Sequence, residues 1–398
     1  MRRVLRAGAA VLDASTVVPR VAIEVADGRI VSIERAERLS PAEEELVVTA
    51  GLIDAHAHLD LGALAGSIEP TGSFLEWVGK VVAARPALDA GSVARGVRRS
   101  VDALADGGTT AVIDIDGSGA VEPALAGAPL RALLLREIID GSPDGLDERS
   151  HQALELARAA CARARTERVA FGLSPHGTHT VGDALLSAVA DLGPPAPVAV
   201  HWAETPEEQH WLERGEGPFA AWLGPSPRCT GTERLQRAGL LAGSLLVHGN
   251  EPSEGEVERV AAAGATVVHC PGSHVYFGRR PFDWGRFASA GVPLALGTDS
   301  WASNERLDMR REIRLARETV GLDAASAWRA ATEIGAALLP WEHVTGRVEV
   351  GAAADLAVFV LKGGASDAAD RPGRILDALT LEEPDLAGLH VAGNIARG

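Results

Sequence analysis

Two histidines separated by one residue, His56 and His58, end the apolar run of residues 51–60. Side chains two positions apart on a β-strand point to the same side, so both imidazoles would project from one strand end. Two imidazoles aimed at one point are half of a metal site of the zinc type. Alone, the pair fits two surface histidines equally well, so the other half must come from elsewhere in the chain.

Polar residues end other apolar runs in the same way. These endings are Ser174-Pro175-His176, His201-Trp202-Ala203-Glu204, His248, His269 and Thr298-Asp299-Ser300. Each could singly be a satisfied core histidine or a helix N-cap, which is the commoner role of such residues. Because six runs end in polar residues at matching positions, we interpret them together as one metal site.

Coordination chemistry assigns the ligands. Three imidazoles and one carboxylate suit a borderline divalent cation, with a water molecule completing its coordination shell. The predicted ligands are His56, His58, His201 and Asp299. The predicted cofactor is one divalent ion, zinc first and ferrous iron as the alternative. Such an ion activates water for hydrolysis near neutral pH.

The remaining polar groups can move protons. His248 and Asp299 are placed to receive or hold the proton that the water loses. Glu204 lies three residues past His201, beyond the strand end, so its carboxyl could approach the reacting atom without binding the metal. We predict Glu204, His248 and Asp299 as catalytic residues, with Glu204 carrying a proton to the leaving group.

These side chains must be positioned by a repeating arrangement of strands and helices. From Gly51 onward, short Val/Ile/Leu runs alternate with alanine-rich amphipathic segments, which is typical of β-α units around a parallel sheet. The predicted strands are residues 52–58, 110–114, 130–138, 169–173, 198–201, 245–248, 266–269 and 294–297. Predicted helices between them include residues 92–105, 152–165, 183–191, 254–263 and 307–319. Eight pairs indicate a TIM-like (β/α)8 barrel, with chemistry at the carboxyl ends of the strands. A doubly wound α/β fold is disfavoured because no glycine-rich phosphate turn follows the first strand.

Both ends of the chain carry β-like segments outside this repeat. Residues 21–25 and 29–33 flank Asp27-Gly28, a strong hairpin signal. Residues 346–350, 354–361 and 389–392 are also β-like, and residues 364–374 resemble a loop. The predicted division is a barrel over residues 49–344 and a small β-sandwich built from residues 1–48 and 345–398.

The composition argues against some classes of partner and indicates the cellular compartment. A net charge of −16 with only two lysines, Lys80 and Lys362, argues against a nucleic-acid partner. Three scattered cysteines without CxxC spacing fit a reducing compartment, so the cytoplasm is predicted. No segment approaches the roughly 20 apolar residues of a membrane span, and Asp13 interrupts the early apolar run before it reaches the length of a signal sequence. The expected partner is a small-molecule substrate, and a homodimer is the expected assembly.

The motifs HAH on the first predicted strand, HWAE on the fifth and LGTDSWASN on the eighth, with histidines ending the fourth and sixth, resemble the amidohydrolase superfamily over essentially the whole chain. The resemblance is greatest to its deaminase and chlorohydrolase branch. It implies one metal at the four predicted ligands, catalytic Glu204 and His248, and a distorted barrel with a side sheet from both termini. Binuclear members bridge two metals through a carboxylated lysine on the fourth strand, and no predicted barrel strand here carries a lysine.

A site with one metal and an HxxE glutamate suits attack on an amidine-like carbon and expulsion of ammonia. The predicted reaction is therefore deamination of a purine-like ring in a nucleoside such as aminofutalosine. Hydrolytic dechlorination and cyclic amide hydrolysis on the same site stay open. A non-catalytic barrel that binds a small molecule is the alternative from another class.

The predicted substrate contacts are His176, Arg136, Arg279 and His274. Ser-Pro-His at 174–176 resembles the segment that approaches substrate in adenosine-type deaminases. His274 stands where many deaminases have an asparagine. Arg279 and its neighbour Arg280 could hold a substrate carboxylate by bidentate bonds. Arg136 and Glu137 end the third predicted strand and are further candidates for the pocket.

Several other polar and aromatic residues are expected to have structural roles. Phe74 and Trp77 are predicted to be core residues of an amphipathic helix. Asp54 and Asp60 flank the histidine pair and could orient the ligands or cap a strand end. The histidines expected to be structural or on the surface are His151, His179, His210, His343 and His390.

Overall fold

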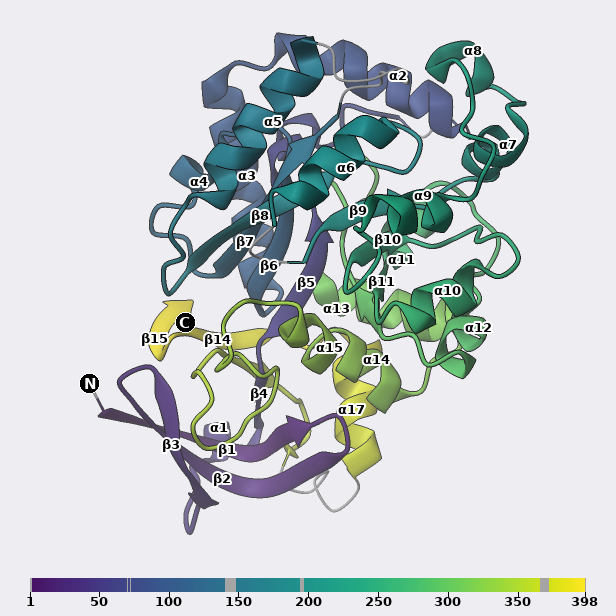
Figure 1. The fold of residues 1–398 in the computed structure, drawn as a ribbon. Coiled ribbons are helices and arrows are strands. Elements are labelled where there is room, and N and C mark those ends of the chain that lie inside the picture. Colours follow the sequence, from purple (N-terminus) through teal and green to yellow (C-terminus); the bar gives the residue numbers. More distant parts are fainter. Residues whose placement is uncertain are drawn as a thin grey trace.

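The computed structural model describes residues 2–69, 71, 73–139, 148–193, 197–365 and 372–397. Eight parallel strands form two four-stranded sheets, ordered β5-β6-β7-β8 and β9-β10-β11-β12 (Figure 1). The strands are β5 Leu52–Ala57, β6 Thr109–Asp116, β7 Arg131–Ile138, β8 Val169–Pro175, β9 Ala199–Trp202, β10 Leu245–His248, β11 Thr266–His269 and β12 Leu294–Leu296. All eight lie where the sequence predicts a strand, so the predicted TIM-like fold class is confirmed.

The two sheets meet at two seams, each made by a single β-bridge. One bridge pairs Ala57 with Asp299, and the other pairs Gly177 with His201. At the first seam His58 N donates to Asp299 O at 2.9 Å, and at the second His201 N donates to His176 O at 2.8 Å. The seams therefore bring the ends of β5, β8 and β9 and the residues after β12 into one ring of backbone contacts.

Helices cover the outside of the sheets (Figure 1). They are α2 Phe74–Ala84, α3 Ala90–Asp106, α4 Val121–Ala124, α5 Glu148–Cys161, α6 Asp183–Asp191, α7 Pro206–Arg214, α8 Ala220–Leu223, α9 Gly231–Ala238, α10 Glu256–Ala262, α11 Pro271–Tyr276, α12 Trp284–Ser289, α13 Met309–Leu315, α14 Ala324–Ala330 and α15 Glu333–Ala337. Shorter helical segments are η1 Leu59–Leu64, η2 Arg85–Ala87 and η3 Ala316–Val320. Local signals set their ends: α7 starts where the Thr205 side chain accepts from Glu208 N, and it stops at Gly215, whose φ is 65°.

The core inside the strands is built from aliphatic side chains. Ile53, Ile113, Leu133, Val247 and Val268 belong to one buried cluster that spans both sheets. Because strands covered on both faces bury nearly every residue, β5 and β6 have no exposed position. The strands thus form a rigid platform whose carboxyl ends carry the polar side chains.

The two ends of the chain build one side sheet of seven strands, ordered β15-β14-β13-β4-β1-β2-β3. Its elements are β1 Arg2–Asp13, β2 Thr16–Ala26, β3 Arg29–Arg35, β4 Leu46–Ala50, β13 Leu356–Val360, β14 Leu386–Val391 and β15 Asn394–Arg397, with α1 Pro41–Glu44 between β3 and β4. A bridge from Arg29 to Ala353 shows that the sheet curls until β3 reaches the segment before β13. The sandwich expected from the two termini is thus a single curled sheet, and the predicted hairpin is β2-β3.

Two expectations for the C-terminal region are wrong. Residues 346–350 form no strand, because the alternating pattern there reflects the burial of Val348, whose N donates to Leu12 O. The predicted loop 364–374 runs into α17 Pro372–Leu381, and residues 366–371 of it lie outside the described residues. The helix forms because Ile375, Leu376 and Leu379 share a face that packs into one cluster with Met309 and Ile313.

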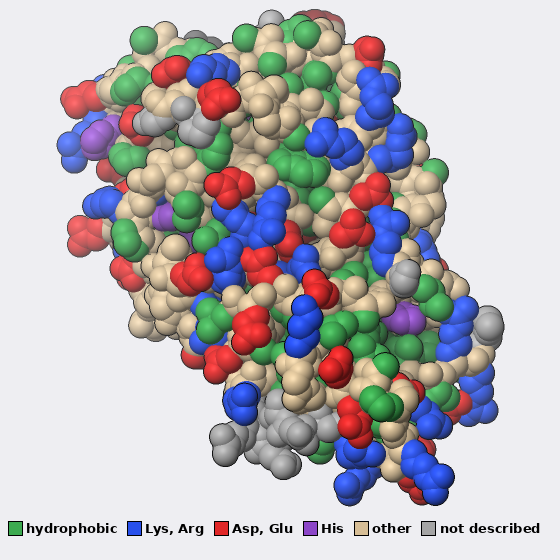
Figure 2. All heavy atoms as spheres, turned by 180° about the vertical axis from the view of Figure 1, so that it is seen from behind, with side chains coloured by type: hydrophobic (Ala, Val, Ile, Leu, Met, Phe, Trp, Pro, Cys, Tyr) green, Lys and Arg blue, Asp and Glu red, His purple; other side chains and the backbone are tan. Residues whose placement is uncertain are grey.

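The surface carries interleaved charges. Figure 2 shows acidic and basic side chains lying beside one another on the face opposite to that of Figure 1. Ion pairs account for part of this mixing, for example Glu383 with Arg306 and Arg314. In the described part of the chain, no helix combines the length and the apolar character that a membrane crossing requires.

Candidate metal centre and active site

Three of the four predicted ligands form a compact group. The ring nitrogens of His56, His58 and His201 lie within 4.8 Å of one another, and all three residues are buried. Asp299 adds a carboxylate, with Oδ1 at 3.7 Å from His56 Nε2 and 3.9 Å from His58 Nε2. Nε2 of His58 and Nε2 of His201 are 3.3 Å apart. Ligand atoms around a tetrahedral zinc with bonds near 2.05 Å are roughly 3.3 Å apart.

The hydrogen bonding of these residues also fits a metal. Three buried ring nitrogens have no hydrogen-bond partner among the described residues. They are Nδ1 and Nε2 of His56 and Nδ1 of His58. Buried polar atoms without partners are rare and need an explanation. Burial lowers the pKa of His201 to about 3, so its imidazole is neutral, the form that binds a metal.

Hydrogen bonds from surrounding groups orient two of the predicted ligands, His201 and Asp299. His201 Nδ1 contacts His176 O at 2.5 Å, which turns Nε2 toward the other ligands. Asp299 Oδ2 accepts from the hydroxyls of Ser273 and Ser303 at 2.6 and 2.9 Å. Burial opposes ionisation of Asp299, yet the neighbouring histidines hold its pKa below the ordinary value.

Asp54 connects β5 to the end of β12 beneath the ligands. Its carboxylate accepts from His56 N at 3.2 Å and from Thr298 N and Oγ1 at 3.0 and 2.5 Å. Burial raises the pKa of Asp54 to about 6. Asp54 therefore orients the backbone at or next to two predicted ligands, His56 and Asp299, which is one of the two roles that the sequence left open.

Three residues at this site have a strained backbone conformation. Ala203, His248 and Asp299 have φ angles of 51°, 79° and 62°, in the left-handed region that residues other than glycine rarely adopt. Such conformations persist only where the surroundings impose them. Each of the three follows or ends a barrel strand, so the strain redirects the chain where the side chains enter the site.

Glu204, the predicted proton donor, lies between His248 and Arg279. Its Oε2 lies 3.7 Å from His248 Nε2, and its Oε1 lies 3.6 Å from Arg279 Nη2. Burial raises the pKa of Glu204 to about 8, although the charge of Arg279 works in the opposite direction. Burial also lowers the pKa of His248 well below its usual value. At neutral pH the pair is a protonated carboxyl beside a neutral imidazole.

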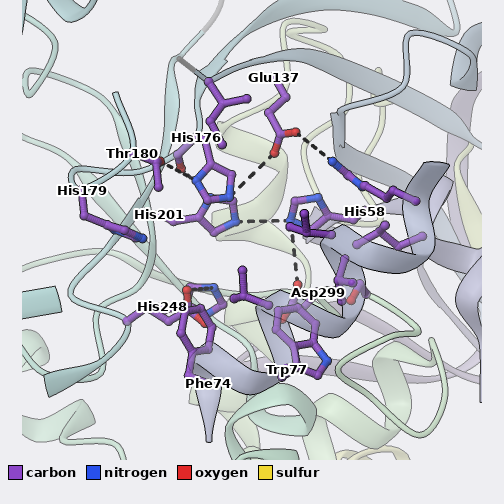
Figure 3. Close-up of a pocket in the computed structure, with 18 of the residues that line it drawn as sticks. His58, Phe74, Trp77, Glu137, His176, His179, Thr180, His201, His248 and Asp299 are labelled. Carbon is purple, nitrogen blue, oxygen red and sulfur yellow. Dashed lines mark hydrogen bonds and ion pairs between the residues drawn. The ribbon is translucent and has the colours of Figure 1, made fainter. Parts of the chain in front are cut away.

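A cleft opens onto these groups (Figure 3). Its floor holds His58, His201, Glu204, His248 and Asp299. Its apolar wall consists of Leu61, Phe74, Trp77, Val78, Val81, Val82, Ile139 and Trp222. Its polar wall consists of Arg85, Glu137, His176, His179 and Thr180. Phe74 and Trp77, expected in the core of a helix, thus line the cleft from α2.

The predicted substrate contacts are placed differently from one another. His176 lines the cleft, whereas Arg136 donates to Asp116 O at 3.3 Å and lines a separate groove with Arg163. Glu137, the next residue on β7, faces the cleft instead. Successive side chains on a strand point to opposite faces, so only one of these neighbours can enter the site.

The predicted contacts between β11 and β12 do not line the cleft. His274 is buried between Asn250 Oδ1, at 3.1 Å, and the backbone oxygen of Arg280, at 2.5 Å. The side chain of Arg280 is 81% exposed and pairs with Glu251. Arg279 Nη2 lies 3.6 Å from Glu204 Oε1, and the Arg279 guanidinium is 5.6 Å from the ring centre of Phe74. Of these predicted contacts, only Arg279 touches a catalytic candidate.

Two buried residues at the site were not anticipated. Glu208 is fully buried and accepts from Ala203 N at 3.2 Å, Glu204 N at 2.8 Å and Thr178 Oγ1 at 2.6 Å. Its carboxylate holds the strained turn that carries Glu204. His179, expected to be structural, lines the cleft and lies 3.6 Å from Glu208. The spacing of Thr205 and Glu208 is a helix-capping signal that could have drawn attention to Glu208.

A metal-binding group at the carboxyl ends of parallel strands, with a proton donor beside it, defines a metal-dependent hydrolase. The chain belongs to the amidohydrolase family, whose family model matches residues 47–398. The predicted family and enzyme class, a hydrolase of carbon–nitrogen bonds, are thereby confirmed.

Named relatives are deaminases. An aminodeoxyfutalosine deaminase of Deinococcus radiodurans is 34% identical over 315 residues, covering 73% of this chain and 72% of that protein. A 5-methylthioadenosine/S-adenosylhomocysteine deaminase of Halobacterium salinarum is 33% identical over 339 residues, covering 80% and 75%. Among solved structures, an adenosine deaminase of Xanthomonas campestris with bound zinc is 26% identical, with a TM-score of 0.80 and coverage of 98% and 92%.

Proposed function

We propose that this chain is an aminohydrolase that removes the amino group from the purine-like ring of a nucleoside. The observation that carries the proposal is the position of Glu204, a buried carboxyl at the floor of the cleft whose Oε2 lies 3.7 Å from His248 Nε2 and whose pKa burial raises to about 8. An amino group leaves as ammonia only after it gains a proton, so a proton donor at this place suits deamination. The named relatives, which are nucleoside deaminases, support the same reaction.

The proposed mechanism uses one divalent ion held by His56, His58, His201 and Asp299. When bound, the metal supplies a Lewis acid that lowers the pKa of a water molecule toward neutrality. Glu204 donates its proton to a ring nitrogen while water adds to the neighbouring carbon. The neutral His248 and the ionised Asp299 accept the proton that the water loses. That proton passes to the amino group, which leaves as ammonia, and the remaining hydroxyl proton returns to Glu204 as the ring carbonyl forms.

Finer features of the protein belong to the same proposal. We infer zinc as the metal, with ferrous iron as the alternative, because imidazole and carboxylate ligands suit both ions. We further propose that residues 49–344 form the catalytic barrel and that the protein is a homodimer. We also propose a cytoplasmic location, which the three free cysteines support because disulfides are rare in that compartment. Elemental analysis, the mass in solution and fractionation of cells test these points separately.

Ammonia release tests the reaction. Metal-loaded protein is incubated with adenosine, 5′-methylthioadenosine, S-adenosylhomocysteine and aminofutalosine, and the ammonia formed is measured. We expect release from at least one of these nucleosides, and the Glu204→Gln variant serves as the inactive control. Silence across this panel, with chloride released from a chlorinated triazine or a cyclic amide opened, would overturn deamination in favour of another hydrolysis on the same site.

A further inference from the structure

We propose that Glu137 and His176 recognise two neighbouring hydroxyl groups on the sugar of the substrate. The inference rests on the proposed function in taking the substrate to be a nucleoside. It gives a role to the polar wall of the cleft, which the proposed chemistry leaves unused, and it makes Glu137 a specificity-determining residue.

Glu137 and His176 face one another across the top of two adjacent strands (Figure 3). Glu137 lies near the end of β7 and His176 directly after β8, and the ladder between these strands pairs Glu137 with Ser174. Glu137 Oε1 is 4.0 Å from His176 Nε2, and Glu137 Oε2 is 3.8 Å from Arg85 Nη1. Both distances exceed hydrogen-bond length, although the Glu137 side chain is only 6% exposed.

The gap between Glu137 and His176 suits hydroxyl groups. His176 Nδ1 is 2.7 Å from Thr180 Oγ1, so Nε2 is the ring nitrogen that faces Glu137. The Glu137 carboxylate is an acceptor, whereas a histidine ring nitrogen either donates or accepts. A hydroxyl group can donate to the carboxylate and can pair with Nε2 in either role, so two neighbouring hydroxyls fit the 4.0 Å gap between these atoms.

Hydroxyl groups fit this wall better than a cation does. Arg85 lines the same wall and lies 3.8 Å from Glu137 and 3.8 Å from Asp60, so a cationic ligand group at Glu137 would lie close to the Arg85 guanidinium. Neutral hydroxyl groups pair with Glu137 and His176 without this repulsion, and a carboxylate has room for two of them.

The position fits a sugar attached to the reacting base. The rings of His176 and His201 are 4.7 Å apart between centroids, so the hydroxyl site adjoins the metal centre. Glu204 and His248 lie elsewhere on the cleft floor, beside Arg279. A base held between them and the predicted ligands would direct its sugar toward Glu137 and His176.

Equilibrium binding of a product tests the inference without turnover. Inosine and 2′,3′-dideoxyinosine are titrated into metal-loaded wild-type protein by calorimetry. We expect inosine to bind on the order of 100-fold more tightly, because two hydroxyls donating to charged or buried acceptors are each worth about tenfold or more. Equal affinities would overturn the proposal.

Glu137→Gln keeps the shape of the side chain but replaces one acceptor oxygen by a donor. We expect its preference for inosine over the dideoxy compound to fall to about threefold or less, with the metal content unchanged. Glu122→Gln, a carboxylate change at an ion pair with Arg163 in the separate groove, is the matched control and keeps the wild-type preference. A full preference in Glu137→Gln would overturn the assignment of Glu137.

The kinetic counterpart separates the two proposals. Adenosine is compared with 2′-deoxyadenosine and 3′-deoxyadenosine, and kcat/KM is expected to fall about tenfold or more for each missing hydroxyl. Discrimination between inosine and dideoxyinosine without ammonia release from any nucleoside would overturn deamination but support the hydroxyl site. Equal kcat/KM for the three nucleosides would support deamination and overturn the hydroxyl site. Glu137→Asp, which withdraws the carboxylate by one methylene, provides a second variant with an intermediate loss.

Discussion

The floor and the mouth of the cleft are built in opposite ways. At the floor, His201, Glu204 and Asp299 are 5%, 7% and 6% exposed, and a carbonyl, a carboxylate or hydroxyl groups fix the segment around each. At the mouth, Val82 and Trp222 are 58% and 52% exposed. The floor comes from strand ends, whereas the mouth comes from α2, α8 and the residue that follows β7.

This difference separates chemistry from selectivity. A rigid, desolvated floor suits a reaction that needs donors and acceptors at fixed distances. The exposed apolar residues Val82, Ile139 and Trp222 come from three elements and line one opening, and exposed apolar residues grouped in this way are typical of a binding surface. Changes at the floor should therefore reduce the rate, and changes at the mouth should alter which substrate is preferred.

Removing a ligand is expected to have the largest effect. Asp299→Ala takes a carboxylate away from His56 and His58 and should lower both metal content and kcat/KM, the latter by about 1,000-fold or more, because a metal supplies several kcal/mol at the transition state. Elemental analysis and ammonia release measure the two effects. Asp323→Ala, which removes only the cap of α14, should keep the metal. An Asp299→Ala protein that retained metal and rate would exclude Asp299 as a ligand.

Replacing Glu204, the proposed proton donor, is expected to have the second-largest effect on activity. Glu204→Gln should reduce kcat by about 100- to 10,000-fold while the metal content stays at the wild-type level, because general acid catalysis contributes in this range. Glu207→Gln, in the first turn of α7, is the control and should keep the wild-type rate. Full activity of Glu204→Gln would show that another group carries the proton.

The pH dependence tests the protonated state of Glu204. Because the acid form is the active one and burial raises its pKa to about 8, kcat/KM should fall as the pH rises above about 8. Arg279 lowers this pKa, so Arg279→Gln should move the alkaline limb to higher pH. Arg280→Gln, whose side chain pairs with Glu251, should leave the limb in place. A limb that moved to lower pH in Arg279→Gln would contradict the assignment.

The smallest effect is expected at the mouth. Trp222→Ala should raise KM by about tenfold for a nucleoside with a large apolar 5′ substituent, such as 5′-benzylthioadenosine, because about 50 Å² of apolar contact is worth on the order of 1 kcal/mol. Adenosine should be affected less than about twofold. Val350→Ala, an exposed apolar residue that is not among the cleft-lining residues, is the control. Equal changes for both substrates would assign Trp222 a structural role.

The sequence predicts the floor better than the walls for a physical reason. Strand ends converge in a barrel whatever the details of packing, so apolar runs followed by histidines were enough to find His56, His58 and His201. Adjacent residues on β7 could not be told apart, because a strand buried on both faces lacks the alternation that shows which side chain points inward. Arg136 was therefore chosen where Glu137 lines the cleft.

Other differences came from contacts that are distant in sequence. Glu208 acts through the backbone of Ala203 and Glu204, and nothing in its local pattern says that its carboxylate turns back toward the strand. Likewise α17 depends on Met309 and Ile313, far from it in the chain, and without them residues 364–374 resemble a loop. The strand expected at 346–350 is absent for a similar reason, because Val348 is buried by contacts with the distant N-terminal sheet.

The two seams between the sheets have a consequence for how the protein matures. Each seam has a single β-bridge, and each bridge contains a predicted ligand. Asp299 pairs with Ala57 of β5 at the first seam, and His201 of β9 pairs with Gly177 at the second. An ion bound by these residues would cross-link the two sheets in addition to taking part in catalysis. We expect removal of the ion by a chelator to lower the melting temperature and to loosen the seams before the rest of the barrel, which makes metal supply the final step of assembly.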